Sequence, residues 1–158
     1  INKKAIKNIL KATQKFNVKN IIIWPNSDAG SDQISKQIRI CRENGSLKNF
    51  KIIKNLPIEY YIPLIKNSKC LVGNSSSAIR DGAFIGVPAV NVGKRQNSRL
   101  SSKNVIQSSN GLEDIIKKIS ILLYNDANIK SNALYVFIKV RIPITKRKSL
   151  CVTTIKIT

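Results

Sequence analysis

The residues best suited to do chemistry are three consecutive serines, Ser75, Ser76 and Ser77, which lie between an apolar run and a predicted helix. The run, residues 70–72, predicts a buried strand, and the helix is expected over residues 76–85. The first N–H groups of a helix have no partner inside it, and its aligned peptide dipoles place partial positive charge there. Small hydroxyl residues would let a diphosphate approach this backbone. The junction predicts an anion site, although for this segment alone plain helix capping by serine is an even alternative.

Other polar groups are expected near these serines. Asp81 lies one turn further along the predicted helix, where its carboxylate could accept hydrogen bonds from ribose hydroxyls. Polar loops also follow two other predicted strands, at residues 25–30 and 93–99. Because the carboxyl ends of parallel strands meet at one edge of a sheet, the three loops should gather there. Each loop alone is more often ordinary turn chemistry, but together they favour a cleft for a sugar nucleotide. The groups that the two outer loops offer are Asn26, Ser27, Asp28, Lys94, Arg95 and Arg99.

The elements that must position these loops alternate along the chain. Short apolar runs predict strands buried on both faces, and apolar residues at helical spacing predict the segments between them. This alternation predicts an α/β fold with a parallel sheet covered by helices on both faces. Pro63 should make one helix irregular. The expected helices cover residues 3–16, 31–43, 58–66, 76–85 and 111–124, and the expected strands cover residues 18–24, 50–54, 70–72, 88–92 and 104–107.

Composition limits the possible functions. The chain has 158 residues, about one domain, and a net charge of +20 from 28 basic and 8 acidic residues. The lysines are scattered and no nucleic-acid-binding motif is present, so we expect no specific nucleic-acid partner. No apolar run approaches the roughly 20 residues that span a bilayer, which favours a cytoplasmic protein without a membrane partner. The three cysteines, Cys41, Cys70 and Cys151, have neither disulfide nor zinc spacing, and we expect core thiols and no metal.

Two absences suggest an incomplete protein. The chain contains no Met and no His, and it opens directly into a predicted helix. With only eight carboxylates, most on predicted surface helices, proton chemistry would be difficult to build within it. We therefore expect a fragment that binds a ligand without a complete active site.

Three segments together carry a family resemblance. Residues 24–32, 73–81 and 90–99 resemble, in sequence, order and spacing, those of UDP-N-acetylglucosamine 2-epimerases, and more closely the hydrolysing branch that releases N-acetylmannosamine. The resemblance covers residues 1–135. It implies a UDP-binding, Rossmann-like domain that is the C-terminal half of a two-domain GT-B fold. It also implies UDP-N-acetylglucosamine or a related UDP-sugar as substrate, no cofactor, a missing N-terminal domain, a homo-oligomeric full-length protein and a sugar pathway such as sialic acid biosynthesis.

The resemblance assigns roles to the serine segment. Ser75 and Ser76 would bind the UDP phosphates, with Ser77 beside them in the substrate-binding set. Asp81 stands where the family usually has Glu, whose carboxylate holds the ribose hydroxyls. Ala78 replaces a usual Gly, and its Cβ would narrow the approach to the backbone.

The remaining assignments are spread over three other segments. Tyr61 matches an aromatic that stacks on uracil, and an ordinary core aromatic is about an equal alternative. Arg95 matches a cleft arginine and is the one expected catalytic residue. Asn26 and Asp28 are weaker candidates at the sugar end.

The family reaction, as the resemblance implies it, removes the C2 proton, expels UDP to give a 2-acetamidoglucal and then adds water. The acids, bases and histidine for these steps come mainly from the N-terminal domain and from just before Ile1. The serine loop and Arg95 would neutralise the charge that develops on the departing UDP. The isolated chain should accordingly be inactive.

The resemblance ends after Tyr135. Residues 136–158 contain six basic residues and no acidic ones, and they lack the Gly-rich turn and closing helix of the family. They are predicted to form an atypical basic tail, strand-like or disordered, mobile and dispensable for stability. A shifted reading frame, a degraded terminus or a genuine basic tail would each explain them.

Two other functions stay open. The donor-binding half of a GT-B glycosyltransferase would share this cleft but transfer the sugar to an acceptor. Gln96 and the loop at residues 25–32 favour the epimerase. A non-enzymatic basic binding module is the second alternative, and it would bind nucleic acid more tightly than UDP.

Overall fold

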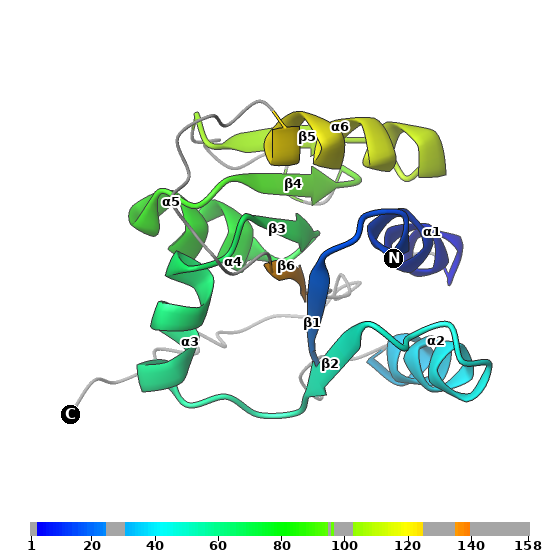
Figure 1. The fold of residues 1–158 in the computed structure, drawn as a ribbon. Helices are drawn as coiled ribbons and strands as arrows, with labels where there is room; N and C mark the ends of the chain where they lie inside the picture. The colour runs from blue at the N-terminus through cyan, green and yellow to red at the C-terminus, as the bar shows by residue number, and fades with distance from the viewer. Residues whose placement is uncertain (1–2, 25–30, 95, 97–102, 125–134, 140–158) are drawn as a thin grey trace, which may run out of the picture.

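The computed structural model describes residues 3–24, 31–94, 96, 103–124 and 135–139, the last segment by its backbone alone. Its helices and strands follow the expected order (Figure 1), with most bounds within one or two residues of those expected. The helices are α1 (Lys3–Gln14), α2 (Ser31–Glu43), α3 (Ile58–Lys66), α4 (Ser76–Ile79), α5 (Asp81–Ile85) and α6 (Leu112–Tyr124). The strands are β1 (Lys19–Ile23), β2 (Phe50–Ile53), β3 (Cys70–Gly73), β4 (Ala89–Val92), β5 (Val105–Ser108) and β6 (Tyr135–Lys139).

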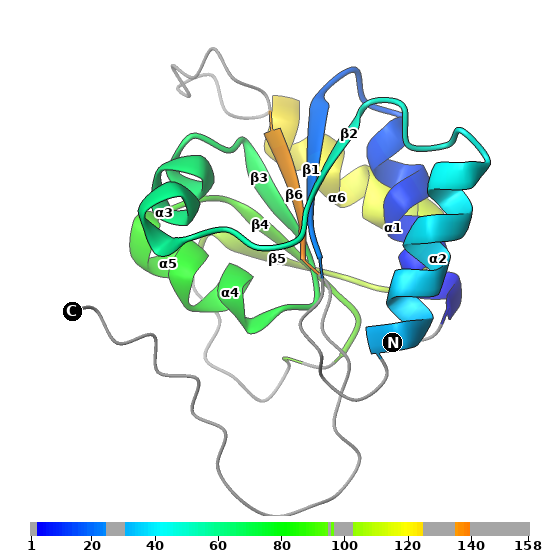
Figure 2. The same cartoon turned by 90° about the horizontal axis from the view of Figure 1, so that it is seen from below.

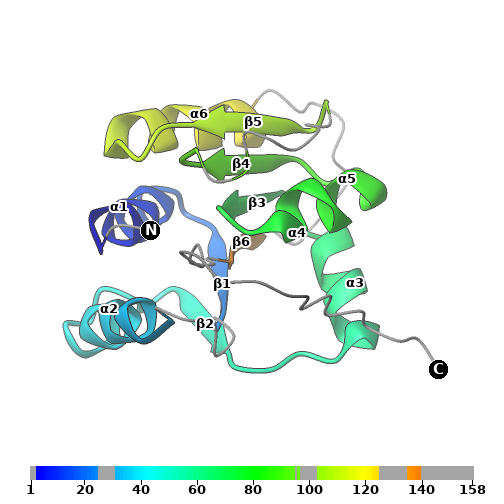
Figure 3. The ribbon, with the colours of Figure 1, turned by 180° about the vertical axis from the view of Figure 1, so that it is seen from behind.

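The six strands form one sheet in the order β2-β1-β6-β3-β4-β5, and every pair is parallel. Helices cover both faces of it: α1, α2 and α6 lie on one side, and α3, α4 and α5 lie on the other (Figures 2 and 3). This arrangement confirms the predicted α/β class with a Rossmann-like parallel sheet.

Each strand divides its side chains between two hydrophobic cores, because successive side chains of a strand point to opposite faces. Ile22 packs with α1, α2 and α6, whereas its neighbours Ile21 and Ile23 pack with α3 and α4. In β3, Val72 belongs to the first core and Leu71 to the second. Burial on both faces explains why these strands read as continuous apolar runs.

The central strand, β6, corrects the expected domain boundary. β6 pairs with β1 on one side and with β3 on the other, with Lys19 opposite Tyr135 and Cys70 opposite Val136. The boundary expected after Tyr135 therefore falls inside this strand, and the segment to Lys139 belongs to the sheet. Pairing between strands so distant in sequence leaves no local signal beyond β-propensity, which is why the segment was predicted as tail. The rest of that tail, residues 140–158, lies outside the described part.

The helix expected over residues 76–85 is also different. It is divided at Arg80 into α4, of four residues, and α5, of five. Gly82, in α5, lies against β3, where an added Cβ would lie only 2.9 Å from Cδ1 of Leu71. α5 then ends at Gly86, whose φ of 81° is a left-handed conformation that glycine adopts readily. Across the described residues, no helix is both long and apolar enough to span a membrane.

Candidate functional site

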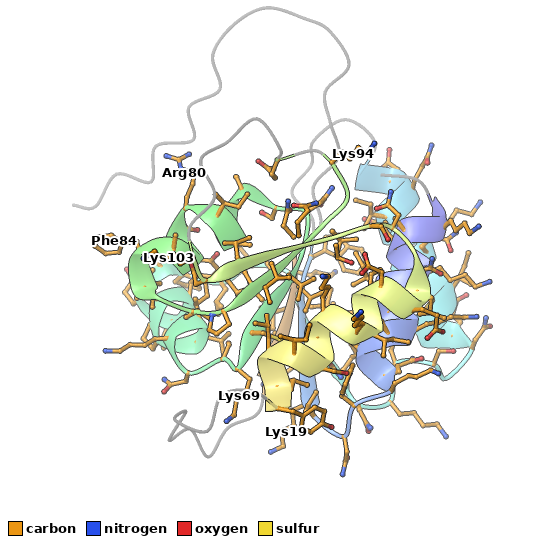
Figure 4. All side chains as sticks on the ribbon, turned by 90° about the horizontal axis from the view of Figure 1, so that it is seen from above. Lys19, Lys69, Arg80, Phe84, Lys94 and Lys103 are labelled. Carbon is orange, nitrogen blue, oxygen red and sulfur yellow. The ribbon has the colours of Figure 1, made fainter. Side chains whose placement is uncertain are left out.

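Two polar loops meet at the carboxyl edge of the sheet. The serine loop, residues 74–77, follows β3, and the β4 turn, defined here as the described residues Gly93, Lys94 and Gln96, follows β4. Nε2 of Gln96 donates a hydrogen bond to the backbone oxygen of Asn74 at 3.1 Å, which joins the two loops directly. Figure 4 shows Lys94 at this end of the molecule, with Lys19 and Lys69 at the opposite end. The expected gathering of these two loops is therefore present.

Ser75 caps the first turn after β3. Its Oγ accepts a hydrogen bond from the backbone N–H of Ser77 at 3.3 Å and lies 3.2 Å from the Ser77 hydroxyl oxygen. Ser75 is buried, whereas Ser76 and Ser77 are half-buried. Ser75 therefore caps the helix, as the capping alternative expected. A serine cap does not decide whether the loop also binds a ligand. Because α4 has only four residues, the dipole of a long helix is not available to the loop.

Tyr61 and Asp81 meet beside the serine loop although they are 20 residues apart. The phenol of Tyr61 donates a hydrogen bond to Oδ2 of Asp81 at 3.2 Å, and the Ser77 side chain also hydrogen-bonds to it. Burial, opposed by the Ser77 bond, raises the pKa of Tyr61 to about 12. Asp81 begins α5 instead of lying one turn inside the serine helix. Tertiary contact therefore brings Tyr61, Asp81 and Ser77 together, which are three members of the expected substrate-binding set.

The surroundings of the Tyr61 ring bear on its expected role. The side chain is only 8 % exposed and packs in the core that contains Leu71 and Ala78. This burial agrees with the core-aromatic alternative. The ring also lines a small apolar pocket whose other walls include Ser75 and Ser77.

The β4 turn is held by uncharged amides. Nε2 of Gln107 donates to the backbone oxygen of Gly93 at 2.6 Å, and Nδ2 of Asn91 donates to Oε1 of Gln107 at 2.7 Å. Gly93 has a φ of 83°, and an added Cβ would lie 2.8 Å from Oδ1 of Asn110. The turn therefore requires glycine at this position.

Sequence reasoning missed this framework. Asn91 interrupts the apolar β4 run and Gln107 lies in β5, and a polar residue inside an apolar strand was the available signal. Asn74, which is fully buried, was likewise not recognised as a contact between the loops. Five other predicted residues lie outside the described part: Asn26, Ser27, Asp28, Arg95 and Arg99.

The described residues form no group of three His, Cys, Asp or Glu side chains that could hold a metal ion. Cys70 is completely buried, and burial raises its pKa to about 12. Cys41 is half-buried, and desolvation is the main cause of its raised pKa, opposed by Lys7 and Lys11. Of these two thiols, Cys70 is the core thiol that was expected; Cys151 lies outside the described part.

Comparison of the chain with known proteins identifies the family to which it belongs. Residues 2–139, which include β6, match the UDP-N-acetylglucosamine 2-epimerase family. The chain belongs to this family. The match confirms the resemblance inferred from the three segments.

Several relatives in this epimerase family are similar to the chain. It is 34 % identical over 101 residues to the UDP-N-acetylglucosamine 2-epimerase of Neisseria meningitidis serogroup B, covering 63 % of the chain and 26 % of the relative. It is 32 % identical over 120 residues to the hydrolysing GDP/UDP-N,N'-diacetylbacillosamine 2-epimerase of Campylobacter jejuni, covering 73 % and 30 %. A hydrolysing UDP-N,N'-diacetylbacillosamine 2-epimerase of Legionella pneumophila is 38 % identical over 98 residues, covering 62 % and 25 %. The matched region thus spans less than a third of these relatives.

Proposed function

We propose that this chain is the UDP-binding half of a hydrolysing UDP-N-acetylglucosamine 2-epimerase, or of a relative acting on a related UDP-sugar. The observation that carries the proposal is the hydrogen bond from Gln96 to Asn74, which joins two of the three family-like segments at the carboxyl edge of a parallel sheet. Ligands of open α/β sheets bind at that edge. The printed names of two relatives, which are hydrolysing 2-epimerases, support the branch.

Within this proposal the phosphates are bound by the serine loop. Ser76 and the backbone of the loop contact the diphosphate, while Ser75 and Ser77 keep the turn in shape through the capping bond at 3.3 Å. Asp81 accepts hydrogen bonds from the ribose hydroxyls, and its contact with Tyr61 orients it. Asp81 is one methylene shorter than Glu, so this contact should be looser than in relatives with Glu.

The other ligand contacts come from outside the serine segment. Tyr61 contacts uracil from the pocket beside the serine loop. Arg95 pairs with the diphosphate, and Asn26 and Asp28 contact the sugar. Lys94, which is exposed next to Arg95, adds positive charge at the same edge.

Catalysis by this half consists of stabilising the leaving group. Elimination of UDP places negative charge on the diphosphate, and hydrogen bonds from the serine loop together with the charge of Arg95 would offset it. The C2 proton is removed by groups of the N-terminal domain, because the chain contains no His. We therefore propose that the complete protein is a cytoplasmic, homo-oligomeric two-domain enzyme and that the chain alone binds UDP without turning over UDP-N-acetylglucosamine.

Calorimetric titration with UDP tests the proposal. Ser76→Ala and Arg95→Ala should each weaken UDP binding by roughly 1 to 3 kcal/mol, the range expected for charge-assisted hydrogen bonds. Ser46→Ala and Lys19→Ala are matched controls, since both residues are exposed and lie toward the opposite edge of the sheet. They should leave the affinity unchanged. If both Ser76→Ala and Arg95→Ala fold and bind UDP as tightly as the wild type, the serine loop serves only as a helix cap and the proposal is wrong.

Activity and competition experiments separate the alternatives. Purified chain should release no UDP from UDP-N-acetylglucosamine, and release free of contaminating enzyme would contradict the proposal. Family membership favours the epimerase over the donor-binding half of a glycosyltransferase. A salt-dependent affinity for nucleic acid that exceeds the affinity for UDP would instead support the basic binding module.

A further inference from the structure

Gln96 combines two features that are uncommon in one side chain. It lies in a turn between two strands, yet only 3 % of it is exposed. Its Nε2 donates to the backbone oxygen of Asn74 at 3.1 Å, whereas its buried Oε1 has no hydrogen-bond partner among the described residues. A buried polar atom without a partner destabilises the folded state. The buried Oε1 of Gln96 therefore lowers the stability of the fold, while Nε2 of the same amide holds the serine loop.

The hydrogen bond acts at a sensitive place. Asn74 is fully buried between the end of β3 and Ser75, the residue that caps the next turn. At the opposite end of the β4 turn, Gln107 fixes the backbone oxygen of Gly93. Gly93 is consequently held to β5, and Gln96, further along the turn, is hydrogen-bonded to the serine loop.

We propose that Gln96 is a positioning residue that holds the serine loop in the geometry needed to bind the diphosphate. This role rests on the proposed function, in which Ser76 contacts the phosphates. Gln96 acts through the backbone oxygen of Asn74 and touches neither substrate nor reacting atoms. An uncharged amide suits the position, since a buried carboxylate at Gln96 would face a carbonyl oxygen and could not donate to it.

Gln96→Met is the principal variant. Methionine retains the length of the side chain and removes both the donor and the unpartnered oxygen, so the thermal midpoint should stay close to that of the wild type. UDP affinity should fall about two- to tenfold, the equivalent of one lost hydrogen bond. Gln96→Asn retains the amide but shortens it by one methylene, and it should lose affinity in the same way.

Asn20 provides a matched control at the amino end of β1. It is buried, its Nδ2 donates to the backbone oxygen of Val18 at 3.1 Å, and its Oδ1 also lacks a partner among the described residues. Asn20→Leu therefore removes the same chemistry far from the serine loop. It should leave UDP affinity unchanged.

Two measurements distinguish positioning from a general structural role. In a double-mutant cycle, Gln96→Met should cost little further affinity once Ser76 is already Ala, because the phosphate contact that Gln96 positions is then already lost. Asn20→Leu should be additive with Ser76→Ala. Hydrogen exchange of the peptide covering residues 74–79 should be faster in Gln96→Met than in the wild type and unchanged in Asn20→Leu.

The hydrogen-exchange result does not depend on UDP, so the two proposals can fail separately. Wild-type chain that does not bind UDP would overturn the proposed function, whereas faster exchange confined to residues 74–79 in Gln96→Met would still support the positioning of the loop. Wild-type binding combined with unchanged affinity and unchanged exchange in Gln96→Met would overturn the role of Gln96. Additivity with Ser76→Ala would overturn it as well.

Discussion

The phenol of Tyr61 on α3 donates a hydrogen bond to Oδ2 of Asp81 on α5 across 3.2 Å. Asp81 is the residue proposed to hold the ribose, so its orientation depends on a helix that precedes β3. The serine segment that contains Asp81 therefore cannot form the ribose and base end by itself. Packing of α3 against α5 is required for the site.

Replacement of Tyr61 tests this contact through its pH dependence. The pKa of Tyr61 is raised to about 12 from an ordinary value of 10.0, chiefly by burial. The corresponding stability is fully present below pH 10.0 and is lost as the pH rises toward 12. Tyr61→Phe should lower the free energy of unfolding at neutral pH by about 0.5 to 1.5 kcal/mol. It should also flatten the alkaline decline, as measured by urea unfolding across that pH range. Identical alkaline profiles in the two proteins would show that Tyr61 does not titrate from a buried state.

Truncation tests the position of β6. A chain ending at residue 134 lacks the strand that joins β1 to β3, so the sheet is divided and cooperative thermal unfolding should be lost. A chain ending at Lys139 retains β6 and should unfold cooperatively. The chain ending at Lys139 lacks five basic residues of the full sequence and should bind heparin less tightly than the full chain does. These residues are Arg141, Lys146, Arg147, Lys148 and Lys156. If the chain ending at residue 134 melts like the full chain, β6 is dispensable and the tail prediction was right.

Asp114 should make the stability of the fold depend on pH in the acid range. Its Oδ2 accepts a hydrogen bond from the backbone N–H of Ser109 at 2.6 Å and another from the Ser108 hydroxyl at 3.2 Å. The Ser109 contact is the main cause of a pKa below the ordinary 3.8. The stabilisation is present above pH 3.8 and is lost as the pH falls through the lowered pKa. Asp114→Asn should be less stable than the wild type at neutral pH, with the difference narrowing in strong acid.

The control for Asp114 is its neighbour Glu113, which is exposed in the same first turn of α6. Glu113→Gln should change the acid unfolding profile less. Equal effects of the two substitutions on acid-induced unfolding would mean that the charge of the helix terminus, and not the Ser109 contact, is responsible.

The thiols should differ in reactivity because the thiolate is the reactive form. Cys70 is fully buried with a pKa of about 12, whereas Cys41 is half-buried. In a Cys151→Ser background, alkylation of the native protein should modify Cys41 first and Cys70 only after unfolding. Mass spectrometry of timed samples measures both rates. Equal rates under native conditions would contradict the burial of Cys70.

The sequence determined the local elements and the edge at which the site forms. A few neighbouring residues are enough to establish each local pattern. These patterns are the continuous apolar runs of β1, β3 and β4 and the helical spacing of apolar residues in α1, α2 and α6. Parallel strands then require the loops after β3 and β4 to meet at one edge. The anion-binding hypothesis for the serine segment depended only on these local features and on the family-like motifs.

Tertiary structure decided what depends on contacts between distant residues. β6 enters the sheet through pairing with β1 and β3, the helix after the serines divides at Arg80, and Gln96 reaches Asn74 across 22 positions. These outcomes arise from pairing and packing energies that no short window of sequence contains. Local periodicity therefore predicted where the two loops of the proposed site meet, and long-range packing decided which side chains hold these loops in place.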